Sequence, residues 1–128
     1  MKTEDFKSVY NESRNGANKM IRHPLMRNFA MSDGVRDLAD TGIWWLVDVL
    51  ATELPAVFRQ QAEVSNTATI KVKVSSGKAT LTAEFDDDVV AWKKHITHTD
   101  MPEGEWLFYM ADEYEGDCRY RIILLSEY

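Results

Sequence analysis

The spacing of apolar residues changes near residue 65, and this change constrains the fold more than any other feature of the chain. Before it, apolar side chains recur at the spacing of one helix face, at Ile43, Leu46, Val47, Leu50 and Leu54. After it, apolar and polar residues alternate, as in the run Thr69–Val74, which is the pattern of a half-buried strand. Helices followed by a run of strands indicate an α+β protein.

This switch of period falls inside one domain, because neither half could cover its apolar face alone. A length of 128 residues also suits one domain and leaves little room for a second. We therefore expect a single domain over residues 1–128, in which residues 1–26 form a peripheral helical lead-in.

The segment 70–85 predicts a β-hairpin whose register can be read from its side chains. Residues 75–78, with the letters SSGK, supply a turn that contains glycine. Pairing Val74 with Ala79 places Val72 opposite Leu81. One face of the hairpin is then wholly apolar and the other wholly polar, which is the agreement that sets a register.

The remaining segments complete the predicted fold. Further strands are expected at 89–97, 106–110 and 119–125, separated by short turns. Pro55 is expected to break the Trp-rich helix or to open a further turn. The economical arrangement is a four- to five-stranded antiparallel meander with N-terminal helices packed on one face.

Acidic residues outnumber basic ones by 21 to 15, which gives a net charge of −6 at pH 7. This balance argues against binding nucleic acid or an anionic membrane, both of which depend on clustered lysine and arginine. Cys118 is the only cysteine, so an intrachain disulfide and a cysteine-based metal site are excluded.

The N-terminal residues are polar and lack the apolar core of a signal peptide. The longest apolar run, Ile43–Val47, is far shorter than a membrane span. These observations predict a cytoplasmic protein.

Four short motifs follow one another in a characteristic order. They are SDGV at 32–35, WLVD at 45–48, TDMP at 99–102 and SEY at 126–128. From about residue 30 to its end the chain resembles an uncharacterised bacterial and phage family, often carried on mobile elements, with T-D-G-V, W-L-x-D, T-D-x-P and S-E-Y. The chain departs from that pattern at Ser32 and in a longer acidic loop. The resemblance implies a fold and a genomic setting, but no reaction.

One candidate pocket lies where the Trp-rich helix is expected to meet the sheet. His98 and Asp100 share a strand face and could act as a base with its orienting carboxylate, while Asp48 beside Trp45 sits on an otherwise apolar helix. The simpler interpretation, which we favour, is that Asp100 begins a turn and that Asp48 is bonded to a backbone amide or faces solvent.

A second candidate is an acidic loop that could dock a basic partner surface. Its four carboxylates are Asp112, Glu113, Glu115 and Asp117. The position of Gly116 does not match a calcium-binding EF-hand loop, and a solvated hairpin tip is favoured. A short basic patch, whose role the sequence leaves open, comprises Arg14, Lys19, Arg22, His23 and Arg27.

Two functional hypotheses remain. The favoured one is a non-catalytic accessory or protein-interaction module, because no phosphate loop, nucleophile elbow or metal-ligand spacing is found. The alternative is a small-molecule-binding protein or a small hydrolase with a pocket at the helix–sheet junction. We expect no cofactor or metal, another protein as the partner, and a homodimer if the final strand is an unpaired edge.

Overall fold

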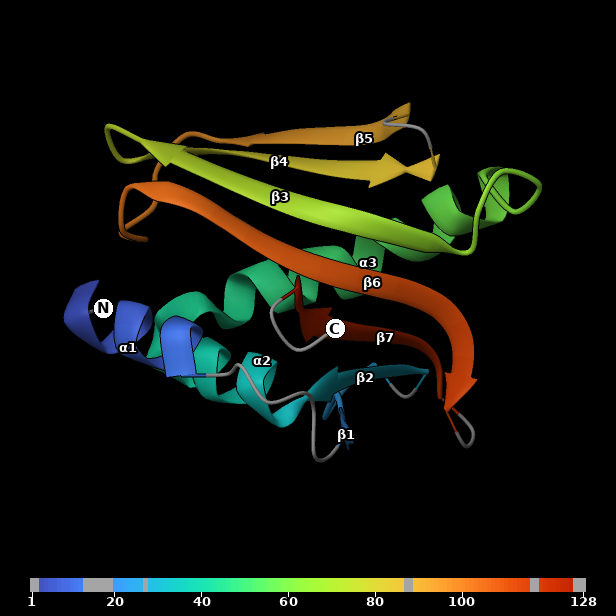
Figure 1. The fold of residues 1–128 in the computed structure, drawn as a ribbon, viewed down its shortest axis with the longest axis horizontal. Helices are drawn as coiled ribbons and strands as arrows, with labels where there is room; N and C mark the ends of the chain where they lie inside the picture. The colour runs from blue at the N-terminus through green and yellow to red at the C-terminus, as the bar shows by residue number, and fades with distance from the viewer. Residues whose placement is uncertain (1–2, 13–19, 27, 87–88, 116–117, 126–128) are drawn as a thin grey trace.

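The structure, a computed structural model, describes residues 3–12, 20–26, 28–86, 89–115 and 118–125. Within these residues the chain is an α+β protein in which a seven-stranded mixed sheet is covered on one face by helices (Figure 1). The α+β class predicted from the change of period is therefore confirmed. The other face of the sheet, called here the outer face, is turned toward the viewer in Figure 1.

The strands occur in two groups along the chain. Two short strands come first, β1 (Met20–Arg22) and β2 (Phe29–Ser32). Five longer ones follow, namely β3 (Thr67–Ser75), β4 (Lys78–Phe85), β5 (Val89–Ile96), β6 (Gly104–Glu115) and β7 (Cys118–Leu124). Their order in the sheet is β1-β2-β7-β6-β3-β4-β5, and every neighbouring pair is antiparallel except β2 and β7.

This order corrects the predicted four- to five-stranded antiparallel meander in two ways. β6 pairs with β3 rather than with the preceding strand β5, and β1 and β2 extend the sheet beyond β7. The inward side chains of β3, Ile70 and Val72, are 0 % exposed, which suits a central strand with neighbours on both sides. β5 carries exposed Lys93 and His95 and is better suited to an edge.

The predicted register of the β3–β4 hairpin is confirmed. Val74 lies opposite Ala79 and Val72 lies opposite Leu81. The turn residues Ser76 and Gly77 have φ angles of 53° and 72°, as a two-residue type I′ turn requires. Because that turn twists in the same sense as the strands, it holds the register that the side-chain pattern selects.

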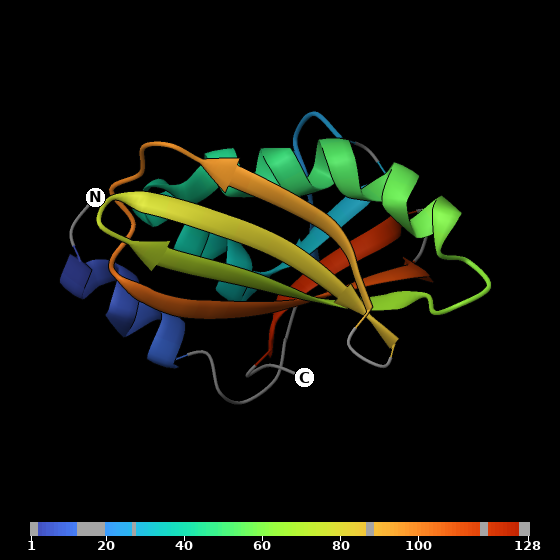
Figure 2. The same ribbon diagram turned by 90° about the horizontal axis from the view of Figure 1, so that it is seen from above.

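The helices are α1 (Thr3–Glu12), α2 (Asp33–Leu38) and α3 (Trp44–Gln60), and the kinked turn η1 (Ala39–Ile43) joins the last two. Ser32 caps α2 by accepting a 3.1 Å hydrogen bond from the Val35 amide. Gly42, with φ of 131°, bends the chain between η1 and α3. These turns bring α3 onto the inner face of the sheet, as the view from above shows (Figure 2).

Pro55 does not end α3, contrary to the expectation of a break, because the helix runs on to Gln60. Proline removes one backbone hydrogen bond, but Leu54, Val57 and Phe58 on the same helix face are all buried. Their packing against the sheet offsets the lost bond. The chain is thus helical well beyond the proline.

By length and composition alone, the helical stretch Asp33–Gln60 could cross a membrane. In the structure it is bent at Gly42, and its apolar residues Leu46, Leu50 and Leu54 are at most 1 % exposed. Their packing with the sheet accounts for the hydropathy of this stretch.

α1 covers the part of β6 that β7 does not reach. The pairing of β6 with β7 begins at Phe108, and the adjacent Leu107 amide donates a 3.1 Å hydrogen bond to the Tyr10 hydroxyl. Phe6, which is 0 % exposed, contacts the Trp106 ring edge-on at 4.8 Å. The helix therefore satisfies a backbone group that would otherwise lie on an open strand edge.

Candidate functional site

Asp48 is bonded to a residue that the sequence placed in the basic patch. The His23 side chain is 3 % exposed, and its Nε2 lies 2.7 Å from Asp48 Oδ1. His23 Nδ1 accepts hydrogen bonds from the Leu25 and Met26 amides, each at 3.0 Å. Because Nδ1 accepts from two backbone amides, the proton of a neutral imidazole must sit on Nε2 and point to the carboxylate.

In this arrangement neither ring nitrogen of His23 is available to exchange a proton with a substrate. A histidine that acts as a general base presents one ring nitrogen to its substrate, whereas both nitrogens of His23 are occupied. The ring also contacts Phe29 and Trp44 edge-on, at 6.2 and 6.0 Å. The pair therefore fastens the chain between β1 and β2 to α3. The basic patch is smaller than predicted, since His23 is buried; Arg14, Lys19 and Arg27 lie outside the described residues.

The other members of the predicted pocket lie elsewhere. His98 and Asp100 are exposed in the loop after β5, and that loop is tied to the β3–β4 turn by a 2.8 Å hydrogen bond from the Thr99 amide to the Gly77 carbonyl. Trp45 is half-buried on α3 and packs against the core. The hydrogen-bond partner of Asp48 is His23, so the predicted set is not joined into one acid–base group.

The acidic segment is largely part of a hairpin rather than a loop. Asp112 accepts two hydrogen bonds from Arg119, at 2.7 and 3.1 Å, and Glu113 accepts one of 2.8 Å from Arg121. The alternating arginines of β7 thus match two of the four carboxylates. The Glu115 side chain and Asp117 lie outside the described residues. Within the described part of the chain, no group of three or more histidine, cysteine, aspartate or glutamate side chains could hold a metal ion.

A polar groove of about 150 Å³ lies on the outer face, where β6, β3 and β4 run side by side. Tyr109, Thr69 and Glu84 form one cross-strand row along it. Ser65, Thr67 and Asp86 also line it. Hydroxyls and carboxylates together suit a polar or cationic ligand. The groove is on the face of the sheet opposite α3, whereas the sequence predicted a pocket between helix and sheet.

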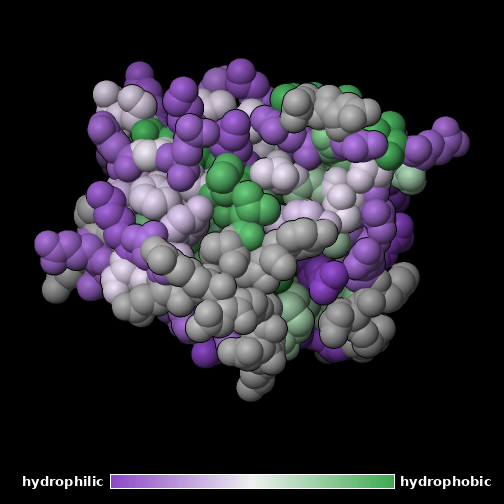
Figure 3. All heavy atoms as spheres, in the orientation of Figure 1, coloured by the Kyte–Doolittle hydropathy of each residue, from purple (hydrophilic) through white to green (hydrophobic). Residues whose placement is uncertain are grey.

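β5 is the longer of the two edges of the sheet, since it pairs only with β4 and the other edge, β1, has three residues. Val89 and Val90 at its start are 43 % and 52 % exposed. Figure 3 shows hydrophobic residues at the upper right of the molecule, where β5 begins. On the inner side, Glu53 of α3 binds Lys94 at 2.6 Å and Trp92 at 3.3 Å. This explains the lysine on the inward face of the strand and holds the edge in place.

The sequence predicted a homodimer on the assumption that the final strand is an unpaired edge, and that assumption is wrong. β7 lies between β6 and β2, so it is not an edge. Any strand pairing with another chain has to use β5 or the short β1, because these are the edges of the described sheet.

The fold defines an α+β protein with a helix-covered sheet, whose long edge β5 has no further strand beside it among the described residues. The chain belongs to DUF6876, a family of unknown function, whose profile matches residues 9–128. No curated protein and no solved structure matches the chain. Family membership supports a domain without a known reaction.

Proposed function

We propose that this protein is a non-catalytic protein-interaction module that binds a strand of a partner protein along β5. The observation that carries the proposal is an edge strand of eight residues, Val89–Ile96, with two exposed valines at its start. An unpaired edge presents backbone donors and acceptors to an incoming strand, and neighbouring side chains select which strand it accepts.

The described residues form no convergent acid–base group, and this supports binding rather than catalysis. His23 uses both ring nitrogens within the fold, and Asp112 and Glu113 are matched by arginines. A protein partner also suits the net charge of −6 better than nucleic acid does.

The test is capture of a partner protein with three matched baits. We expect the tagged wild-type protein and the Val64→Lys variant to retain the same chain, either another protein or an untagged second copy, from a bacterial lysate that contains both, and Val90→Lys to lose it. Val64 and Val90 are similarly exposed, at 48 % and 52 %, but only Val90 lies on the edge strand. A lysine there discourages strand pairing. Capture that survives Val90→Lys would sink the proposal.

The proposed setting is the cytoplasm of a bacterium, with the protein encoded on a phage or another mobile element. Its support is the ordered set of motifs from SDGV to SEY. Neighbouring genes that encode phage or transfer functions would agree with this setting, and a chromosomal housekeeping operon would contradict it.

A second candidate function, binding of a polar small molecule, is favoured by the groove beside Tyr109 and Glu84. Its hydroxyls and carboxylates suit an amine-bearing ligand. We expect polyamines such as spermidine to raise the melting temperature of the wild-type protein, and Glu84→Gln to reduce that shift. Glu113→Gln, outside the groove, is the control. Equal shifts in both variants would indicate nonspecific charge binding.

A further inference from the structure

We propose that the strand that pairs along β5 is β5 of a second copy of this chain, running antiparallel about a twofold axis. This inference rests on the proposed function, because it names the occupant of the same edge. It replaces the final strand, which is internal, with the edge that the fold leaves open.

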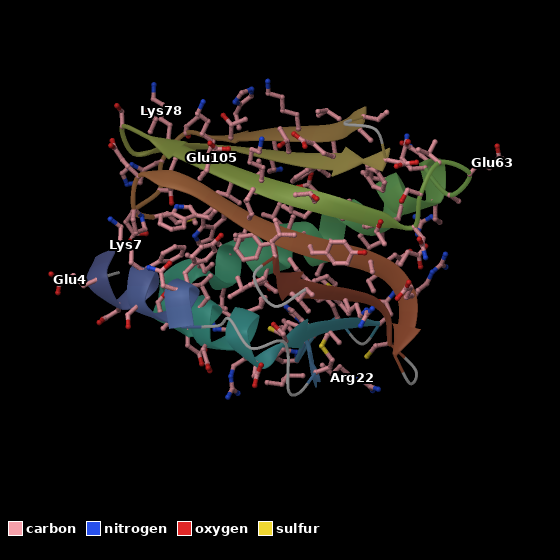
Figure 4. All side chains as sticks on the ribbon, viewed as in Figure 1. Glu4, Lys7, Arg22, Glu63, Lys78 and Glu105 are labelled. Atoms are coloured by element: carbon pink, nitrogen blue, oxygen red, sulfur yellow. The ribbon has the colours of Figure 1, made fainter. Side chains whose placement is uncertain are left out.

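The charges near β5 are divided between the two ends of the strand. Lys93 and His95 are exposed on the second half of β5, and Lys78 is exposed beside its end. Neither lysine forms an ion pair with a described residue, and His95 lies 3.3 Å from the Thr80 hydroxyl. Two carboxylates lie at the same end: Glu103 accepts a hydrogen bond from the Ser76 amide, and Asp100 is exposed in the loop after β5. Figure 4 shows Lys78 at this end of the sheet.

The opposite end of the strand is acidic and apolar. Asp86 is exposed just before β5 begins, and Glu84 lies opposite Val90. Glu63, labelled in Figure 4, lies at this end of the molecule, far from Lys78. Glu84 forms an ion pair with Lys71 at 3.6 Å, which balances its charge. Asp86 therefore contributes most of the negative charge at this end.

A twofold axis makes these two ends complementary. In an antiparallel pair about such an axis, the start of each strand lies beside the end of the other, and each contact occurs twice. Val90 of one copy is then close to His95 of the other, and Asp86 lies toward the end that carries Lys78 of the other copy. With strands about 4.8 Å apart, β4 of one copy lies about 10 Å from β5 of the next, roughly one Debye length at 0.1 M salt. Opposite charges thus meet on both sides of the axis, and the exposed valines are covered.

An edge can also be built to prevent pairing. Lys93 and the bulge opposite Ala83 and Glu84 are devices that protect edges. That interpretation predicts a monomer at every concentration, and it predicts that added charges of either sign at Val90 act alike. Both predictions differ from those of the twofold pair.

The test is analytical ultracentrifugation over a range of protein concentrations with wild type, Val90→Lys, Val90→Glu and Val64→Lys. The two Val90 variants lose the same apolar side chain and differ only in the sign of the added charge. We expect the wild type to dimerise and Val90→Lys to raise the dimer dissociation constant at least about tenfold, because it faces the basic end of the other copy. Val90→Glu should bind as tightly as wild type or more tightly, and Val64→Lys should match wild type.

Two results would overturn the inference: a wild-type protein that is monomeric throughout, or equal weakening by Val90→Lys and Val90→Glu. A monomer that still captures a lysate protein through β5 overturns only the second copy as occupant. A monomer that captures nothing overturns the proposed function as well. Circular dichroism of each variant checks that the fold is retained.

Discussion

At the scale of single residues, His23 is a histidine whose two ring nitrogens both form hydrogen bonds within the fold. Its ring nitrogens accept from two backbone amides and donate to Asp48. The imidazole thereby closes the turn between β1 and β2 and joins it to α3 over 25 residues of sequence. A polar side chain buried in this way contributes stability only while all its partners are present.

We expect His23→Ala to lower the free energy of unfolding by about 1–3 kcal/mol, because two backbone amides lose their acceptor. Asp48→Asn retains an oxygen that can accept from Nε2, so its cost should be smaller, less than about 1 kcal/mol. His98→Ala is the control, since exposed His98 should change stability by no more than about 0.5 kcal/mol. Chemical denaturation measures all three. If His23→Ala and His98→Ala cost the same, the imidazole is not a structural fastener.

At the scale of elements, one side of β6 is covered partly by the strand β7 and partly by the helix α1. β7 pairs with β6 from Phe108 onward, and Tyr10 of α1 binds the next free amide, that of Leu107. Tyr120 of β7 presents the opposite case, since its buried hydroxyl finds no hydrogen-bond partner among the described residues.

Removing one oxygen from each tyrosine should therefore have opposite consequences. We expect Tyr10→Phe to reduce the free energy of unfolding by about 0.5–1.5 kcal/mol, because the Leu107 amide loses its acceptor. Tyr120→Phe should leave stability unchanged or raise it by up to about 1 kcal/mol, because it removes an unsatisfied buried group. Thermal or urea unfolding distinguishes the two. A loss for Tyr120→Phe as large as that for Tyr10→Phe would mean that the Tyr120 hydroxyl is bonded.

At the scale of the whole molecule, helices cover one face of the sheet, and the long edge β5 pairs with no further strand among the described residues. Glu53 of α3 binds Lys94 and Trp92 of that strand. These contacts fix the position of β5 although only one of its sides is paired with another strand. The exposed valines and Asp86 at its start, and Lys93 with Lys78 toward its end, are the basis on which we propose a second copy as the occupant. Raising the salt concentration should weaken such a dimer, because screening shortens the range of these contacts.

The alternating residues of 70–85 determined one hairpin and its register from the sequence alone, because side chains in a strand repeat every second residue and a short turn joins neighbours. The stripe from Ile43 to Leu54 determined the main helix in the same way. Only the tertiary structure decided that β6 lies beside β3, that His23 is the partner of Asp48, and that arginines of β7 match Asp112 and Glu113. These contacts join residues from separate elements. The spacing of apolar residues within one segment does not show which other segment packs or pairs with it. The sequence thus determined the α+β class and its best hairpin, while packing decided which strand remained an edge.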